Sequence, residues 1–320
     1  MAEGWLIEQG IGEDRALLIE HGQVIAARVD WPGELAAGQI EDAKLLHRTT
    51  GSTRGTAQFA SGAQALVSSL PREANEGGTL RLKVTRAAIA EAGRGKLAHA
   101  RPTDEAPRPA PRLIEALNGK LTHAFPAGLW DEVFAAAWHG SLDFAGGAII
   151  ISPTPAMTVI DIDGTLPPLQ LALAAVPALA EAIDLMDLSG SIGIDFPTLE
   201  QKADRKLVDV ALEAALNHWP HERTAMNGFG FVQLVARCER PSLVARMAHD
   251  RAGAAARLLL RRGEQVLDPG TLLLTAHPEV LRAINPAWRA DLARRTGRRI
   301  EWRPDSALAL DGGYAQAVTA

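Results

Sequence analysis

Two short stretches decide how this chain folds: MTVIDIDGTL at residues 157–166 and SGSIGIDF at residues 189–196. Each is an apolar, largely β-branched run that ends in acid, and such a run is typical of a buried strand. The apolar segment between them, residues 169–188, is long enough for a helix. A strand, a crossover helix and a second strand place the two strands side by side, so we expect their acids to come together.

The acids that end these two strands are Asp161, Asp163 and Asp195. A carboxylate costs several kcal/mol to bury without a partner, so each of them needs one. Carboxylate oxygens that face one another are the ligands that Mg²⁺ or Mn²⁺ requires. The sequence therefore predicts a divalent metal site here; the alternative is that these acids cap loops or pair with arginine.

Composition sets only broad bounds. A chain of 320 residues can hold two or three domains with a real core. The single cysteine, Cys238, excludes an internal disulfide and a cysteine-rich zinc site. No apolar run reaches the roughly 18 residues needed to cross a bilayer, and the N-terminus lacks the basic segment of a signal peptide. We therefore expect no zinc, no membrane contact and a cytoplasmic location.

Charge is unevenly distributed. Residues 237–303 contain fourteen arginines, no lysine and seven acids, which gives a charge near +7, although the whole chain carries −5. A basic segment on an acidic protein predicts a polyanionic partner. The alternative is a solvated helical face.

Short strand patterns fill the first hundred residues. Residues 16–20 and 24–29 predict a hairpin. Further short strands with glycine turns predict a small closed barrel of the oligonucleotide-binding type. These strands lie at residues 55–60, 63–67, 79–86 and 96–100. The proline-rich, charged residues 101–112 predict a linker.

Helices and strands alternate in the remainder of the chain. Helices are predicted at residues 129–139, 199–219, 252–262 and 278–295. Besides the two acid-bearing strands, strands are predicted at residues 148–152, 230–236, 271–275 and 298–303. The order predicts an α+β chain that ends in a small α/β domain.

One hexapeptide has a second interpretation. Residues 161–166, DIDGTL, match the first motif of the haloacid-dehalogenase phosphatases, in which the first Asp attacks phosphorus beside Mg²⁺. That family also needs a downstream Lys and a paired acidic motif. Only Lys202 and Lys206 follow, without such a motif. A phosphatase of this type is therefore a rival hypothesis.

A longer resemblance runs through the chain in seven blocks. They are GEDRALLIEHGQVIAARVDWPG at 12–33, residues 38–71, residues 76–101, residues 130–163, DLSGSIGIDF at 187–196, NGFGFVQLVARCERPSL at 227–243, and residues 275–284 with 294–305. In this order they resemble a shortened member of the ribonuclease E/G family. The resemblance implies the following parts: RNase H-like strands at 1–38, an inserted RNA-binding barrel of the oligonucleotide-binding type at 39–101, a proline-rich linker and remnant at 102–128, a deoxyribonuclease I-like catalytic metal-binding domain at 129–245, and a small C-terminal α/β domain at 246–320.

The resemblance also implies roles for the acids. In the family two Asp bind one Mg²⁺, and an Asn two residues after the first orients them. Asp161 and Asp195 match the two Asp, and Asp163 stands where Asn is usual. The ion, Mg²⁺ or alternatively Mn²⁺, would polarise the scissile phosphate and activate water.

Three further residues are implied to bind RNA. Phe59 matches a barrel aromatic that stacks on bases, the alternative being barrel core. Arg94 and Lys96 lie near basic barrel residues of the family and are expected to contact phosphate. We expect single-stranded RNA to bind through the barrel and the arginine-rich segment.

The chain departs from the family pattern near the acids. Gly164, Thr165 and Leu166 follow them without the usual Arg, apolar residues surround 172–175, and Gly228 replaces an Arg on the closing strand. The regions of the 5′-monophosphate pocket and of the zinc link are missing. We therefore expect a metal-dependent endoribonuclease of reduced activity; a degenerate, non-catalytic RNA-binding protein is the second alternative. DNA is not expected as a partner, and the oligomeric state stays open.

Overall fold

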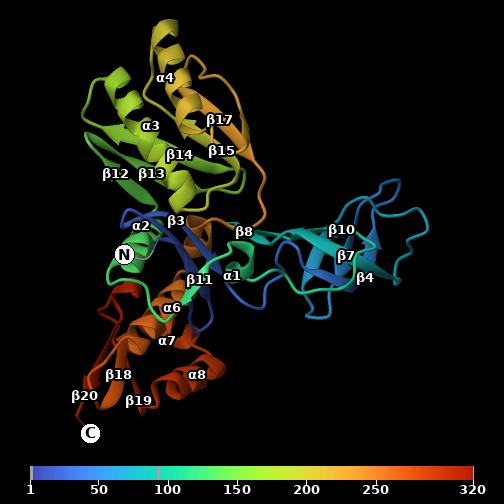
Figure 1. The fold of residues 1–320 in the computed structure, drawn as a ribbon. Helices are drawn as coiled ribbons and strands as arrows, with labels where there is room; N and C mark the ends of the chain where they lie inside the picture. The colour runs from blue at the N-terminus through green and yellow to red at the C-terminus, as the bar shows by residue number, and fades with distance from the viewer. Residues whose placement is uncertain (1–2, 92–93, 320) are drawn as a thin grey trace.

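The computed structural model describes residues 3–91 and 94–319, leaving aside the side chains of residues 90, 91 and 94. In this part of the chain, an N-terminal sheet lies at the centre, with a closed barrel projecting to one side. A six-stranded sheet lies beyond one end of the centre, and a small three-stranded sheet lies beyond the other (Figure 1). The coarse prediction of an α+β chain with a small barrel is confirmed.

The N-terminal sheet has the strand order β11-β1-β2-β3. Its strands are β1 (Gly4–Gln9), β2 (Asp14–Glu20), β3 (Gln23–Asp30) and β11 (Lys120–Thr122). β2 and β3 form the predicted hairpin, turning at His21 and Gly22, both of which have positive φ. The finer RNase H-like assignment stays a prediction.

The barrel closes in the order β10-β6-β5-β4-β7. Its strands are β4 (Ile40–Arg48), β5 (Gly55–Gln58), β6 (Gln64–Val67), β7 (Thr79–Arg86) and β10 (Ala98–Pro102). A hairpin of β8 (Ile89–Glu91) and β9 (Arg94–Lys96) precedes the last strand. The inward residues of the strands form a core of their own, separate from that of the rest of the chain.

The predicted linker is not a free tether. Arg108 and Ile40 exchange two backbone hydrogen bonds of 2.9 Å, which fix the segment along the barrel. Glu105 accepts hydrogen bonds from Lys83 and Arg108. The chain then forms the short helix α1 (Leu113–Ala116) and enters β11.

The six-stranded sheet, here called the acid-bearing sheet, has the order β12-β13-β14-β15-β17-β16. Its strands are β12 (Ser141–Phe144), β13 (Gly147–Pro153), β14 (Thr158–Gly164), β15 (Gly190–Asp195), β16 (His221–Arg223) and β17 (Phe231–Ala236). β14 and β15 pair in parallel, as the crossover predicted, whereas β13 and β17 flank them antiparallel.

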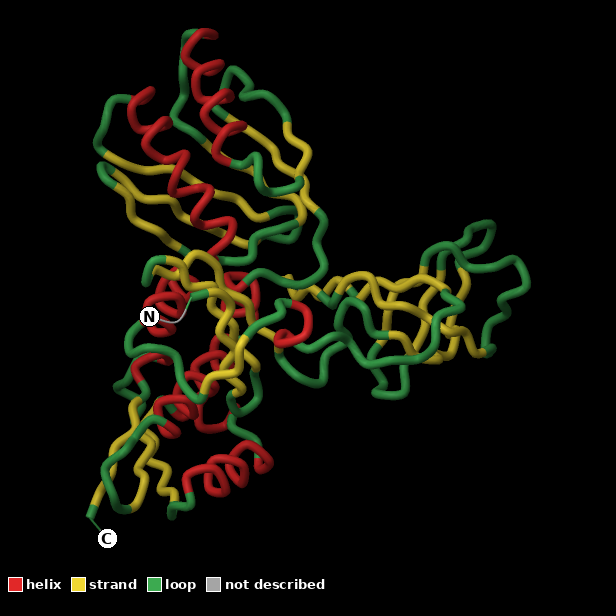
Figure 2. Tube along the Cα trace, in the orientation of Figure 1, coloured by secondary structure: helices red, strands yellow, loops and turns green. Residues whose placement is uncertain are grey.

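Helices cover one face of this sheet. The crossover is α3 (Pro168–Leu185), which packs on β12, β13 and β14 and beside α4 (Lys202–Ala215) (Figure 2). By length and composition α3 is apolar enough to cross a membrane, contrary to the expectation that no segment qualifies. Half of its residues are buried against the sheet, α4 and β3, as in the core helix of a folded domain.

The remaining helices join the layers. α2 (Leu129–His139) has the predicted bounds, and α5 (Leu243–His249) and α6 (Arg251–Glu264) lead into the three-stranded sheet β19-β18-β20. Its strands are β18 (Thr271–Ala276), β19 (Ile300–Pro304) and β20 (Tyr314–Val318). The predicted helix at 278–295 is two helices, α7 (Pro278–Ala283) and α8 (Pro286–Thr296), because Asn285 caps α8 and Pro286 begins it. A 3₁₀ turn, Leu310–Gly312, precedes β20.

Part of the arginine-rich segment has a structural role. The Arg261 side chain is 3% exposed, and its Nε lies 2.9 Å from Glu8 in the N-terminal sheet. Arg257 lies 3.8 Å over the ring of Trp31. Further arginines of the segment paired with acids are Arg237, Arg240, Arg246, Arg262, Arg282, Arg294, Arg295 and Arg299. Arg261 and Arg257 thus join α6 to the N-terminal part of the chain. Other arginines of the segment are largely exposed and pair only with acids close to them in sequence, so RNA binding by this segment stays a prediction.

Candidate functional site

Asp161 and Asp195 are neighbours in the acid-bearing sheet. They lie directly opposite each other in the parallel pair of β14 and β15. Ile160 and Ile194, one residue before each acid, are fully buried against the helices. Because side chains alternate along a strand and neighbouring strands lie about 4.8 Å apart, both carboxylates project from the exposed face at the same level. The structure thus brings these two predicted residues together.

The oxygens of this pair are available to a ligand. Among residues 3–91 and 94–319, no ion pair or side-chain hydrogen bond involves Asp161 or Asp195, and both are exposed. The alternative that they cap loops or pair with arginine is therefore not what the described structure contains. Two unpartnered carboxylates fit Mg²⁺, which is commonly held by one or two carboxylates, with water and phosphate oxygens in the remaining positions.

Asp163 stands apart from the pair. It lies on the same face, two residues further along β14 and opposite Ala148. Its Oδ1 accepts a hydrogen bond of 2.8 Å from the Gly164 N–H. No group of three or more His, Cys, Asp or Glu side chains in the described part of the chain is arranged to hold a metal. A metal at this sheet would therefore have the pair alone as its carboxylate donors, with Asp163 at the rim.

The rest of the DIDGTL motif has a structural explanation. A Cβ at Gly164 would lie 2.4 Å from the Gly146 carbonyl oxygen, so only glycine permits the close approach of the β12–β13 turn. Thr165 donates its N–H to the same oxygen at 3.1 Å, and Leu166 covers Gly146. These residues close a hairpin, and no described ion pair joins a lysine to Asp161.

Two aromatic residues that the sequence analysis did not select lie beside the acids. Phe231 is opposite Asp195 on β17, and its ring lies over Gly193. Phe229 is 82% exposed on the preceding turn. The side-chain oxygen of Asn227 accepts the N–H groups of both, at 2.9 and 3.1 Å, which fixes the turn. The glycines on either side of Phe229 were the available signal.

A fourth acid, Asp143, was also missed. It is exposed on β12, opposite Ala148, which is in turn opposite Asp163. It therefore shares the face of the pair, but its strand is separated from β14 by β13. This makes Asp143 a natural control for experiments on the pair.

The predicted RNA contact of Phe59 is corrected by the structure. Its side chain is 2% exposed within the barrel core. A ring enclosed on both faces cannot stack on a base, so the barrel-core alternative holds. The side chain of Arg94 lies outside the described residues, although its backbone pairs with Glu91 in the β8–β9 hairpin.

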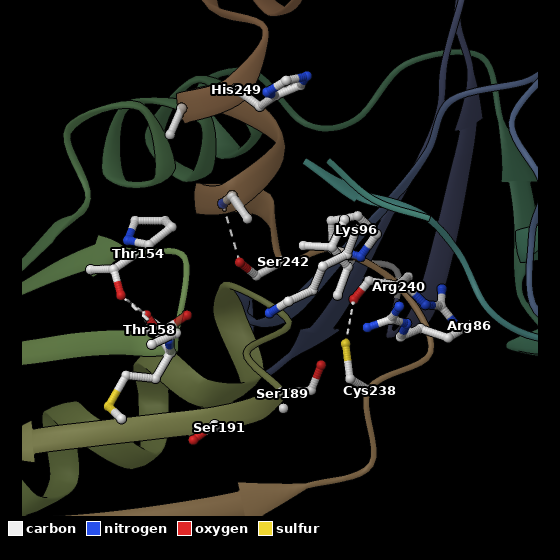
Figure 3. A pocket seen from close by; sticks show the side chains of 18 of the residues that line it. Arg86, Lys96, Thr154, Thr158, Ser189, Ser191, Cys238, Arg240, Ser242 and His249 are labelled. Carbon is white, nitrogen blue, oxygen red and sulfur yellow. Dashed lines mark hydrogen bonds between the residues drawn. The ribbon is translucent and has the colours of Figure 1, made fainter. Parts of the chain in front are cut away.

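Lys96 lines a pocket of about 700 Å³, here called the basic pocket. Its Nζ donates a hydrogen bond of 3.1 Å to the Pro155 carbonyl oxygen. The basic pocket lies where β14 and β15 begin, with Thr158 and Ser191 in its lining (Figure 3). Asp161 and Asp195 lie three and four residues further along these strands. Lys96 is therefore remote from the carboxylates.

Comparison with known proteins gives one family. A search of curated proteins found no match. Residues 138–237 match the model of the Ribonuclease E/G family. This span is about a third of the chain and contains all six strands of the acid-bearing sheet, including the DIDGTL motif. Through this sheet, which carries Asp161 and Asp195, the chain is similar to the ribonuclease E/G family.

Proposed function

We propose that this protein is a metal-dependent endoribonuclease that cleaves single-stranded RNA, with Asp161 and Asp195 as the ligands of the metal ion. The observation that carries the proposal is their register: two exposed carboxylates, without a partner among the residues that the structure describes, lie opposite each other within the segment that matches the family. A divalent ion held there, Mg²⁺ or Mn²⁺, would supply charge for the scissile phosphate and an activated water.

The residues around the pair determine what else the site supplies. The exposed face of β14, β15 and β17 carries no Lys or Arg; it consists of Val159, Asp161, Asp163, Ser191, Gly193, Asp195, Phe231, Gln233 and Val235. No cation of the sheet therefore helps to neutralise a phosphate. Asp163 adds a further negative charge, which strengthens the attraction for a metal and repels RNA. We expect slow cleavage that depends strictly on the ion, because fixed positive groups usually supply much of such a rate.

Phe229 supports a substrate contact in place of Phe59. An aromatic ring that is 82% exposed on a fixed turn beside Asp195 can stack on a base next to the scissile bond. Such a contact is worth about 1–3 kcal/mol per base and tolerates any sequence. Asp163, held through Oδ1, has its second oxygen available to orient the attacking water.

The test is cleavage of a fluorogenic single-stranded RNA with Mg²⁺ and with EDTA. We expect slow cleavage that EDTA, Asp161→Asn and Asp195→Asn each abolish. Asp143→Asn, the matched control on the same face, should cleave like the wild type. Wild type that binds RNA but never cleaves it would indicate the non-catalytic alternative. Turnover of p-nitrophenyl phosphate without RNA cleavage, lost in Asp161→Asn, would indicate the phosphatase.

A further inference from the structure

The basic pocket is formed by segments that are distant in the sequence. Its walls are the end of β7 and the β8–β9 hairpin from the barrel, the β13–β14 turn, the start of β15, and the connection from β17 through α5. In Figure 3, Arg86, Lys96 and Arg240 gather on one side, and Thr154 and Thr158 lie across from them. The volume of about 700 Å³ is large enough for a nucleotide.

The charge of the lining is one-sided. Arg86, Lys96 and Arg240 supply three cations, and His249 lies at the edge. No Asp or Glu is among the lining residues described, although the chain carries a net charge of −5. Hydroxyl groups complete the polar lining, on Thr154, Thr158, Ser189, Ser191 and Ser242. Guanidinium, ammonium and hydroxyl groups together are the donors that recognise phosphate.

The two arginines keep hydrogen-bonding capacity for a ligand. Arg86 donates from Nη2 to the Leu97 carbonyl oxygen at 2.9 Å, but its buried Nε has no partner among the described residues. Arg240 lies 3.7 Å from Asp187 and 4.0 Å from Asp30, beyond direct hydrogen-bonding distance. Asp187 is engaged by a closer partner, because the Nε of Arg28 lies 3.1 Å from its Oδ1.

We propose that the basic pocket is a second, non-catalytic site that binds a phosphate group. Thr158 and Ser191 at the pocket are three and four residues from Asp161 and Asp195 along their strands. At about 3.3 Å per residue, a phosphate bound there lies on the order of 10 Å from the carboxylates, too far to be the group that reacts. The basic pocket would hold the RNA strand between the barrel and the acid-bearing sheet during cleavage, and this role rests on the proposed function.

Binding is tested separately from cleavage, in the full chain carrying Asp161→Asn. RNA affinity is measured by fluorescence anisotropy at two salt concentrations, with Lys96→Gln, Arg86→Gln and Arg240→Gln added singly. Each should weaken binding about tenfold, as expected for one charge-assisted hydrogen bond, and reduce the salt dependence by about one counterion. Lys96→Arg should restore binding. Arg237→Gln is the matched control, because Arg237 is 80% exposed, three residues from Arg240 and outside the lining.

The source of the phosphate is separated by three probes. If the pocket variants lose affinity equally for 5′-phosphorylated and 5′-hydroxyl RNA, the pocket binds an internal phosphodiester. If they lose more affinity for the 5′-phosphorylated RNA, the pocket binds the phosphate at the chain end. Competition by adenosine monophosphate, with direct binding lost in Lys96→Gln, indicates a free nucleotide. Each outcome supports the pocket, and the last supports it even if wild type never cleaves RNA. Cleavage by wild type together with unchanged affinity of folded Lys96→Gln and Arg86→Gln for all three probes would overturn the pocket and leave the proposed function intact.

Discussion

Replacement of Phe59 distinguishes a core residue from an RNA contact. The Phe59 ring is 2% exposed and packs within the separate core of the barrel. Phe59→Ala should lower the free energy of unfolding of the barrel by about 3–5 kcal/mol. A domain of about 60 residues has only marginal stability, so we expect the barrel of this variant to be largely unfolded. Phe59→Leu keeps the site apolar and should cost about 1–2 kcal/mol, leaving the barrel folded.

The assay combines urea unfolding with RNA binding by folded Phe59→Leu. If Phe59 stacked on a base, loss of the ring would weaken binding by about 1–3 kcal/mol, or roughly 5- to 150-fold. A core role predicts nearly unchanged affinity together with a lower urea midpoint. Phe59→Leu that unfolds at the wild-type midpoint but binds RNA more than about fivefold more weakly would refute the reasoning.

Three further predictions follow from the contacts. Arg261→Met removes one of the two arginines that pair with buried Glu8 and leaves the other, Arg15, in place. It should lower the free energy of unfolding by about 1.5–3 kcal/mol, as for the loss of hydrogen bonds to a charged group, whereas the exposed Arg282→Met should change it by less than about 1 kcal/mol; equal losses in urea unfolding would contradict the buried network. Burial raises the pKa of Asp187 above its ordinary value of 3.8, so the unfolded chain loses this proton at a lower pH than the folded chain does. As pH rises above about 4, the free energy of unfolding of wild type should therefore fall relative to that of Asp187→Asn, and the difference should then level off. A difference that grows with pH would show that the pKa shift has the opposite sign. Phe229→Ala should leave the melting temperature unchanged and weaken RNA binding about tenfold, and unchanged binding would exclude the stacking role.

The strands and the barrel could be predicted because a strand and its turns depend on residues that are close together in the sequence. The runs VIDID and IGID contain the alternation that places Ile160 and Ile194 inward and both acids outward. The hairpin and barrel strands were likewise marked by glycine turns. The split between α7 and α8 was also encoded locally, in Asn285 and Pro286, but the apolar periodicity across it hid the break.

The properties that were missed depend on distant partners. Phe59 and Phe229 are the same residue type, yet one is enclosed by five strands and the other stands on a turn. Arg261 looks basic in sequence, but its partner Glu8 is 253 residues away. The basic pocket needs the barrel and the acid-bearing sheet to meet. None of these arrangements follows from the pattern of a single segment.

In the proposed function, Asp161 and Asp195 together hold one divalent ion. Isothermal titration with Mn²⁺ measures this directly, without RNA or turnover. We expect one site in wild type and in Asp143→Asn, and loss of that site in Asp161→Asn and in Asp195→Asn, with all four proteins equally folded. Mn²⁺ binding of wild-type strength by the double variant Asp161→Asn, Asp195→Asn would contradict the account.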